Sequence, residues 1–355
     1  MSVFIIAEAG VNHNGSLETA MRLVDAAVAA GADAVKFQTF KAEKLVTQAA
    51  EKAEYQKQSS GEAESQLAML KGLELKYEFH FQLRDYCLAQ GIQFLSTAFD
   101  FDSLAFLVQE VGIEQLKIPS GEITNGPFLL AHAKTGKNII VSTGMTTLGE
   151  VETALGVLAF GYLEWDKPSL AAFQQAFSTV EGQAILKNKV TLLHCTSEYP
   201  TPMADVNLLS MDVLRQAFDL PVGYSDHTEG LVVPIAAAAR GATLIEKHFT
   251  LDKNLKGPDH KVSLAPEELK QMVAAIRSVE QALGSPRKIP QPVELENRNV
   301  VRKSLVAGAA IPVGESFSAE NLTSKRPGMG VSPMEYWRLL GKASQRAYRP
   351  DDLIE

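Results

Sequence analysis

Cysteine is scarce in this sequence, which has only Cys87 and Cys195 among its 355 residues. Two cysteines cannot build a disulfide framework, so we expect a reducing compartment, the cytoplasm. Long apolar runs are also missing, and without a stretch of about 18 apolar residues no transmembrane helix is expected. The opening residues, MSVFIIAEAG, have no basic segment and are typical of a buried strand rather than a signal peptide.

Positive charge is in deficit, with 34 lysines and arginines against 42 aspartates and glutamates and a net charge of -8. This balance argues against nucleic acid and anionic membranes as partners. An anionic small substrate remains compatible, because a few basic side chains in a cleft can reverse the local potential. Hydrophobic residues make up 46% of the chain, which at this length predicts one large domain and a smaller one.

Short apolar runs alternate with amphipathic stretches from residue 3 to about residue 283, a rhythm typical of strand–helix units. The predicted strands cover residues 3–9, 33–39, 92–98, 115–121, 138–144, 190–196, 221–227 and 243–249. Eight such units favour an α/β fold closed into a (β/α)8 TIM barrel. The first strand is followed by AEAGVNHNG, which lacks the G-x-G-x-x-G pattern, so a dinucleotide-binding Rossmann fold is disfavoured.

Two insertions interrupt the strand–helix repeat, and a linker and a small domain follow it. Residues 41–75 and 163–189 lengthen the units after the second and fifth strands, and we expect functional lids or flexible segments there. We place the barrel domain at residues 1–284, a proline- and charge-rich linker at 285–297, and a small domain at 298–355. A unit of about 60 residues is marginal alone, and we expect it to dock on the barrel or on a partner subunit.

The predicted strands begin apolar and end in charged or hydrogen-bonding residues. These ends carry Glu8, Lys36, Gln38, Ser96, Thr97, Lys117, Ser120, Glu122, Ser142, Thr143, His194, Thr196, Ser225, His227, Glu246 and His248. Barrel active sites lie at the carboxyl ends of the strands. Because unpaired buried polar groups are costly, we expect these residues to form a site rather than a packed core.

His227 and His248 end adjacent predicted strands, so their imidazoles could share one divalent metal and leave positions open for water and substrate. Two hydrogen-bonded histidines without a metal are the alternative. His80 and His132 fall in helical patterns and are expected at the surface or in packing roles. His194 is interpreted as a core histidine with satisfied hydrogen bonds.

Lys36 and Lys117 are expected to face inward, where a bound phosphate or carboxylate would balance their charge. A salt bridge to Glu8 or Glu122 is the alternative. Glu8, Glu122 and Glu246 are candidate acid–base groups or hydroxyl acceptors, with orientation of a lysine or histidine as the alternative. The small residues that could form a phosphate cradle are Ser120, Gly121, Ser142 and Gly144.

Nine motifs in this order resemble signatures of the bacterial sialic acid synthase family. They are FIIAEAGVNHNG, VKFQTFKAEKL, KIPSGE, VSTGM, LLHCTSEYPTP, GYSDHT, IEKHFTLDK, KGPDH and KRPGMG. The resemblance spans nearly the whole chain and includes a C-terminal antifreeze-like (SAF) domain. It implies a condensation of phosphoenolpyruvate with an open-chain N-acetylated amino sugar, with release of phosphate and a divalent metal, Mn²⁺ or Mg²⁺. It also implies a homodimer in which the antifreeze-like domain of one subunit reaches the active site of the other.

The resemblance implies roles for individual residues. The metal ligands would be His227 and His248, and the phosphoenolpyruvate contacts Lys36, Lys117, Ser120, Ser142 and Ser225. The sugar contacts would be Gln38, Glu122, Tyr199 and Asp259, with Arg326 reaching the N-acetyl group across the dimer. Glu8 and Glu246 match acidic positions of the family site. The catalytic candidates are therefore Glu8, Lys36, Lys117, Glu122 and Glu246.

Two departures from the family pattern concern a phosphoenolpyruvate contact and the subgroup within the family. Ser197 stands where some members have asparagine, and FQTF stands where some have HQTH. FQTF together with AEYQKQSSGEAESQLAMLKGLEL resembles a subgroup that contains N-acetylneuraminate and N,N'-diacetyllegionaminate synthases. We expect N-acetylmannosamine as the substrate and N-acetylneuraminate as the product. The alternative is a 2,4-diacetamido-6-deoxyhexose that leads to N,N'-diacetyllegionaminate, and a metal-dependent barrel aldolase or isomerase is a remoter one.

Overall fold

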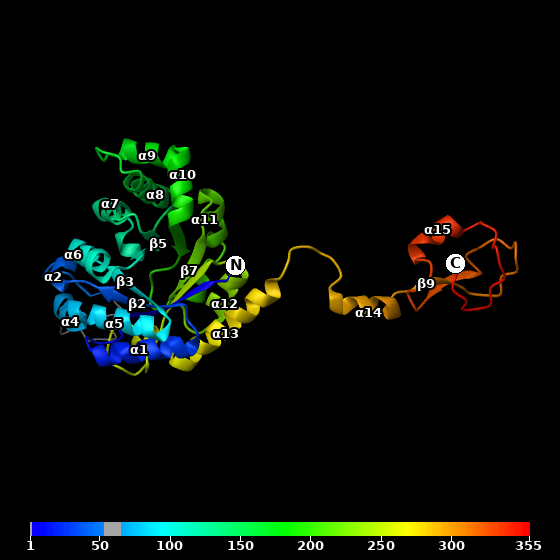
Figure 1. Ribbon diagram of the computed structural model, residues 1–355, viewed down its shortest axis with the longest axis horizontal. Helices are drawn as coiled ribbons and strands as arrows, with labels where there is room; N and C mark the ends of the chain where they lie inside the picture. The colour runs from blue at the N-terminus through cyan, green and yellow to red at the C-terminus, as the bar shows by residue number, and fades with distance from the viewer. Residues whose placement is uncertain (1, 53–64) are drawn as a thin grey trace. The chain divides into compact units, whose positions relative to one another are not determined.

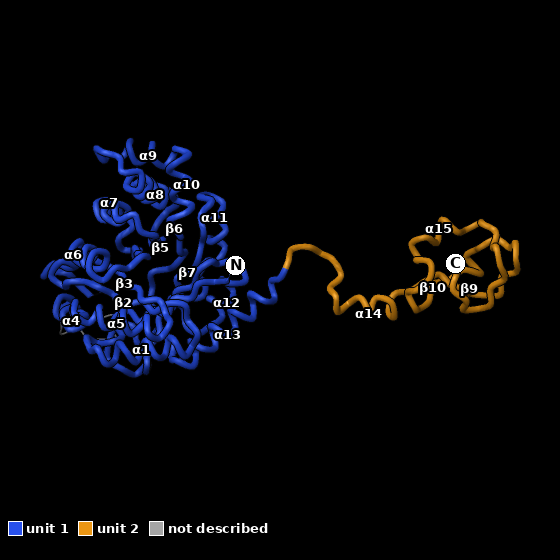
Figure 2. Tube along the Cα trace, in the orientation of Figure 1, with its two compact units in different colours: residues 1–284 blue, residues 285–355 orange. Residues whose placement is uncertain are grey.

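The computed structural model describes residues 2–52 and 65–355, and the chain divides into two compact units (Figure 2). The first unit spans Met1–Gly284 and the second spans Ser285–Glu355. Within the described part of the chain, no helix combines the length and the apolarity that a membrane crossing requires.

Eight parallel strands form a nearly closed barrel in the first unit, with helices on its outside (Figure 1). The strands are β1 (Phe4–Gly10), β2 (Ala34–Thr39), β3 (Gln93–Ala98), β4 (Gln115–Ile118), β5 (Asn138–Ser142), β6 (Val190–His194), β7 (Val222–Asp226) and β8 (Leu244–His248). Their order is β3-β2-β1-β8-β7-β6-β5-β4, so β3 and β4 meet at the seam. The predicted (β/α)8 barrel is confirmed.

The helices alternate with the strands as the amphipathic stretches predicted. They are α1 (Leu17–Ala30), α5 (Tyr77–Gln90), α6 (Phe101–Phe106), α7 (Gly126–Lys134), α8 (Leu148–Tyr162), α11 (Ser210–Phe218), α12 (Val232–Ala239) and α13 (Pro266–Leu283). The α1 helix begins where the Ser16 hydroxyl accepts the Thr19 N–H, and it ends at Gly31, whose φ of 80° is costly for residues with a side chain.

The barrel interior is filled at its lower level by one cluster of buried apolar side chains. Its members are Ile6, Ala34, Leu95, Ile140, Leu193 and Leu244. Because side chains two residues apart share a face of a strand, the next inward position on each strand lies above this plug. On β1 the inward step leads from Ile6 to Glu8, and on β8 it leads from Leu244 to Glu246 and His248. The apolar layer thus supports a polar layer at the carboxyl ends of the strands.

The two long insertions differ in what the structure shows. Residues 163–189 contain the helices α9 (Leu170–Ser178) and α10 (Val180–Lys189), where a lid or flexible segment was expected. The insertion at 41–75 contains α2 (Ala42–Leu45) and α4 (Gln66–Leu73). Residues 53–64 of that insertion lie outside the described residues.

The second unit contains the antiparallel pair β9 (Ser304–Ala307) and β10 (Leu322–Lys325) and the short helix α15 (Tyr336–Leu339). Its own core consists of Leu305, Ala307, Ile311, Phe317, Leu322, Leu339, Tyr348 and Ile354. The expected linker at 285–297 is only partly irregular, because α14 (Pro292–Val301) begins inside it. Pro292 suits the first helical turn, and the Glu294 carboxylate accepts the Gln291 N–H at 2.7 Å.

Candidate active site

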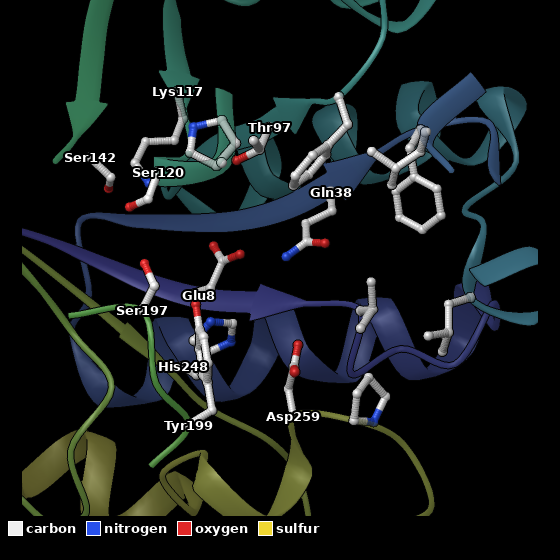
Figure 3. A pocket seen from close by; sticks show the side chains of 18 of the residues that line it. Glu8, Gln38, Thr97, Lys117, Ser120, Ser142, Ser197, Tyr199, His248 and Asp259 are labelled. Carbon is white, nitrogen blue, oxygen red and sulfur yellow. The ribbon is translucent and has the colours of Figure 1, made fainter. Parts of the chain in front are cut away.

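A cavity of about 370 Å³, partly open to solvent, lies at the carboxyl ends of the barrel strands (Figure 3). Twelve of the fourteen residues given a role by the family resemblance line it, and so does Thr97. The other strand-end residues expected in the site, Ser96, Thr143, His194 and Thr196, do not line it. The residues brought together are Glu8, Lys36, Gln38, Lys117, Ser120, Ser142, Tyr199, Ser225, His227, Glu246, His248 and Asp259. Strands β1, β2, β4, β5, β7 and β8 contribute to this lining, so the convergence expected for a barrel is present.

The two residues given a role by the resemblance that do not line the cavity are Glu122 and Arg326. Strand β4 ends at Ile118, earlier than predicted, because Pro119 has no N–H to continue the ladder. A short 3-10 turn, Ser120–Glu122, follows, and the Glu122 carboxylate accepts a hydrogen bond from the Asn125 amide at 2.7 Å. Arg326 directly follows β10 in the second unit.

Two lysines and two glutamates form a buried charge network at the floor of the cavity. Lys36 Nζ lies 2.6 Å from Glu8 Oε2 and 3.5 Å from Glu246 Oε2, and Lys117 Nζ lies 3.0 Å from Glu246 Oε1. Ser225 Oγ donates to Glu246 Oε1 at 2.8 Å. The lysines thus have glutamate partners within the protein, although the partners are Glu8 and Glu246 and neither is Glu122.

The two glutamates of the network have pKa values shifted in opposite directions. Burial disfavours the ionised form of Glu246, but Lys117 and Lys36 outweigh it and hold its pKa well below the usual range. Burial raises the pKa of Glu8 to about 7, with Lys36 opposing the shift and Glu246 adding to it. Burial opposes the charge of Lys36, yet Glu246 and Glu8 raise its pKa. Glu246 is therefore a fixed anion between the two ammonium groups.

Small hydroxyl side chains gather beside Lys117 and around the backbone of Gly144. Ser120 Oγ accepts the Gly144 N–H at 3.0 Å and lies 3.1 Å from Cys195 Sγ. A Cβ atom at Gly144 would stand 2.7 Å from Ser120 Oγ, so only glycine leaves this space open. The Ser142 hydroxyl is buried without a hydrogen-bond partner in the described structure. Such a group is suited to bind a ligand oxygen.

The two strand-end imidazoles approach one another at the same cavity, with ring centroids 5.9 Å apart. His227 Nδ1 lies 2.7 Å from the Thr196 carbonyl oxygen, which can only accept, so Nδ1 carries the proton and Nε2 carries a lone pair. That Nε2 lies 3.1 Å from the Tyr199 hydroxyl. His248 Nδ1 is buried without a hydrogen-bond partner in the described structure.

These imidazoles fit a divalent metal by their chemistry. Burial lowers the pKa of His227 and lowers that of His248 well below its usual range, so both rings are neutral near pH 7. A neutral imidazole whose other nitrogen is held by a carbonyl is the ordinary metal-ligating form of histidine. No group of three or more histidine, cysteine or acidic side chains arranged for a metal occurs among residues 2–52 and 65–355. Water and substrate would have to supply the other ligands.

The remaining histidines are mainly buried. His80 and His132 are fully buried in α5 and α7, which places them in packing roles rather than at the surface. His80 hydrogen-bonds the Thr39 hydroxyl at 2.7 Å, and His132 Nδ1 donates to the Phe128 carbonyl at 2.8 Å. His194 bonds the Val206 carbonyl at 2.8 Å, as expected for a satisfied histidine.

Sequence reasoning gave no role to an apolar part of the cavity lining. This apolar wall consists of Val11, Phe40, Leu45, Met69, Leu70, Leu73 and Phe99, which pack as one cluster and also line the cavity. Val11, Phe40 and Phe99 follow directly on β1, β2 and β3. An apolar residue just beyond the end of a strand was the available signal, because that position faces the mouth of a barrel.

Comparisons with known proteins bear on the whole chain. A model of the NeuB family matches residues 23–288, and a model of the SAF domain matches residues 302–355, as predicted for the C-terminal region. N,N'-diacetyllegionaminic acid synthase of Campylobacter jejuni is 48% identical over 99% of this chain and 98% of its own length. The synthase of the same name from Legionella pneumophila is 47% identical over 96% and 90%. The crystal structure of the N-acetylneuraminic acid synthetase of Leptospira borgpetersenii superposes with a TM-score of 0.67 at 33% identity, over 84% of this chain and 90% of that one.

Proposed function

The chain belongs to the NeuB family of phosphoenolpyruvate-dependent synthases, and we propose that its sugar substrate is a 2,4-diacetamido-6-deoxyhexose. The product would then be N,N'-diacetyllegionaminate. The observation that carries this proposal is the identity of 48% and 47% to two N,N'-diacetyllegionaminic acid synthases over nearly their full lengths. That similarity favours the alternative substrate over N-acetylmannosamine, which the sequence alone had put first.

Phosphoenolpyruvate would bind at the charged floor of the cavity. Lys36 and Lys117 supply two ammonium groups for its phosphate and carboxylate, and the hydroxyls of Ser120, Ser142 and Ser225 supply donors. Glu246 lies within ion-pair distance of both lysines, so it holds them in place before the substrate arrives. A preorganised site of this kind spends little of the binding energy on rearrangement.

The reaction would join C3 of phosphoenolpyruvate to the aldehyde carbon of the open-chain sugar. The aldehyde oxygen takes a proton and becomes a hydroxyl, while C2 of phosphoenolpyruvate becomes electron-poor. Water adds to C2 and loses a proton, and the bond between C2 and the phosphate oxygen then breaks. The products are a 2-keto acid and inorganic phosphate. Lys36 and Lys117 stabilise the phosphate as it departs.

His227 and His248 are the residues that would hold a divalent cation. Such a cation supplies Lewis acidity, which polarises a carbonyl group. The Thr196 carbonyl keeps the proton of His227 on Nδ1 and thereby points Nε2 into the cavity. The Tyr199 hydroxyl lies 3.1 Å from that nitrogen. When the cation binds to Nε2, this hydroxyl would be released and could hydrogen-bond the sugar.

The proton of the attacking water would go to Glu8. Glu246 has three partners, Lys36, Lys117 and Ser225, so it is committed to holding the site together. Within residues 2–52 and 65–355, Glu8 has Lys36 as its one ion-pair partner, and it lies at the same level of the cavity. A carboxylate that is less constrained can form a new hydrogen bond at lower cost.

Arg326 would act across a homodimer, reaching the acyl group of the sugar bound to the partner subunit. The resemblance to the sialic acid synthase family supports this role, and the SAF match covers the segment that carries the residue. An arginine suits the task because its fixed fork of donors recognises carbonyl oxygens without losing its charge.

The experiment that tests the proposal is a phosphate-release assay with the purified full chain. Phosphate should appear only when phosphoenolpyruvate, a divalent cation and an N-acetylated sugar are all present, and it should appear faster with the 2,4-diacetamido-6-deoxyhexose than with N-acetylmannosamine. Release of phosphate without the sugar, or consumption of the sugar without phosphoenolpyruvate, would contradict a condensation.

A further inference from the structure

The cavity has two chemically different parts. Its charged floor is built from β1, β2, β4, β7 and β8, with Lys36, Lys117 and Glu246 at its centre. The apolar wall belongs to the ends of β1, β2 and β3 and to the helices α2 and α4, which carry Leu45, Met69, Leu70 and Leu73. Because β1, β2 and β3 are neighbours in the sheet, the wall is one continuous surface at one side of the barrel mouth.

Gln38 and Asp259 mark the border between these parts. In Figure 3, Gln38 lies between the labelled polar group around Lys117 and a set of carbon-only side chains on its other side. In the same view, Asp259 lies below Gln38 and to the right of His248. A sugar whose aldehyde lies at the two imidazoles would pass Gln38 and Asp259 and place its far end against the wall.

We propose that the apolar wall is the specificity-determining subsite for the far end of the sugar, and that it takes a methyl-bearing, acylated tail. This inference rests on the proposed function. A tail of hydroxyl groups would lose water at the wall without gaining hydrogen bonds, which is costly. A 6-deoxy methyl group and the methyl of an acetamido group would bury apolar surface there.

The border residues suit the polar atoms of the same substrate. An acetamido group has an N–H and a carbonyl next to its methyl group, and the Gln38 side chain offers an acceptor and a donor. Burial raises the pKa of Asp259 to about 6, so near pH 7 its carboxylate accepts hydrogen bonds. One substrate group can therefore meet both kinds of surface at once, with its amide at the border and its methyl on the wall.

Substrate preference in matched variants tests the inference. The values of kcat/KM are measured for the full chain with phosphoenolpyruvate and Mn²⁺, using the 2,4-diacetamido-6-deoxyhexose and N-acetylmannosamine. Leu70→Ser removes a half-buried side chain of the wall, and Leu67→Ser is its control on α4, since Leu67 is half-buried but does not line the cavity. Phe99→Tyr adds one hydroxyl to the wall without removing volume.

We expect the wild type to prefer the deoxy sugar by at least about tenfold, the scale of one methyl contact in an apolar pocket. Leu70→Ser and Phe99→Tyr should each lower that preference several-fold by reducing kcat/KM for the deoxy sugar, while Leu67→Ser leaves it unchanged. An unchanged preference in both wall variants would overturn the inference, whereas equal use of both sugars or a preference for N-acetylmannosamine would contradict the proposed function on which it rests. If Leu70→Ser fails to fold, the sugar preference of Phe99→Tyr alone tests the inference. Phosphate release with no N-acetylated sugar at all would also contradict the proposed function.

Discussion

Lys36 and Glu8 are register partners on the adjacent strands β2 and β1, and their side chains meet inside the barrel with Nζ 2.6 Å from Oε2. Both side chains are almost fully buried. A buried ion pair is costly to form and costlier to break, because removing one partner leaves the other charge without compensation. This pair therefore links the stability of the barrel to the charge of its active site.

The first prediction concerns that pair. Lys36→Met should lower the free energy of unfolding by about 3–5 kcal/mol, since Glu8 then lies buried without its ion-pair partner. The double variant Lys36→Met with Glu8→Gln should recover much of the loss. Unfolding in urea measures both. The control is Lys44→Met, which removes a solvent-exposed partner of Asp102 and should cost about 1 kcal/mol or less. If Lys36→Met and Lys44→Met lowered the free energy of unfolding equally, the buried pair would matter no more to stability than an exposed one.

The second prediction concerns metal binding. His248→Ala should weaken Mn²⁺ binding by about 100-fold or more, because one of two imidazole ligands is lost. Titration calorimetry or Mn²⁺ paramagnetic resonance on the purified chain gives the affinity without any catalytic assay. His194→Gln is the control, since His194 does not line the cavity. If chelator-treated wild type kept full activity, or if His248→Ala bound Mn²⁺ normally, the imidazoles would be hydrogen-bonding groups only.

The third prediction concerns the proposed homodimer. Arg326→Ala and His248→Ala should each be inactive alone, but a mixture that exchanges subunits should regain about a quarter of the wild-type activity, because half of the dimers then contain one complete site. Phosphate release before and after mixing measures the recovery. An arginine that serves its own subunit would give no recovery, and that result would refute the cross-subunit contact. Lys325→Ala, next in the chain, is the matched control and should stay active.

The fourth prediction concerns stability in acid. Burial lowers the pKa of His13, His80 and His132 to about 4 each, whereas an unfolded histidine titrates near 6.5. The unfolded chain thus binds more protons between these values, so stability is full above pH 6.5 and is lost as the pH falls toward 4. Each group contributes on the order of 3 kcal/mol at the acid end.

His132→Phe tests this source of acid lability. It keeps an aromatic ring against Phe128 but removes the titrating group, so the free energy of unfolding should change less between pH 6.5 and 4 than in the wild type. The measured quantity is the slope of the free energy of unfolding against pH. A general loss of stability lowers the whole curve but does not change this slope. Parallel curves for the two proteins would mean that His132 takes no part in the acid transition.

The barrel and most of the site could be predicted from the sequence because both depend on local periodicity. The step of two residues from Ile6 to Glu8, and from Leu244 to Glu246, places a polar residue directly above an apolar plug in each strand. The position of His227 beside His248 follows from strand adjacency alone. These inferences need no knowledge of how distant segments pack.

What could not be predicted depends on backbone detail or on distant packing. Glu122 was expected to line the cavity, but Pro119 ends β4 early and a 3-10 turn carries the residue away. The apolar wall joins three strand ends to residues of an insertion, and no periodicity links Phe40 with Leu70. The pairing of Lys117 with Glu246 spans 129 positions of sequence, so it emerges only once the barrel closes.

The central claim, that phosphate leaves by cleavage of the bond between carbon and oxygen after water has added to C2, is tested most directly by isotope labelling. Phosphoenolpyruvate carrying ¹⁸O in the oxygen that bridges C2 and phosphorus is incubated with the chain, Mn²⁺ and the deoxy sugar. The account predicts that the ¹⁸O leaves entirely with inorganic phosphate. Recovery of the label in the keto acid would mean that the bond between phosphorus and oxygen breaks, and would contradict the proposed chemistry at Lys36, Lys117 and Glu8.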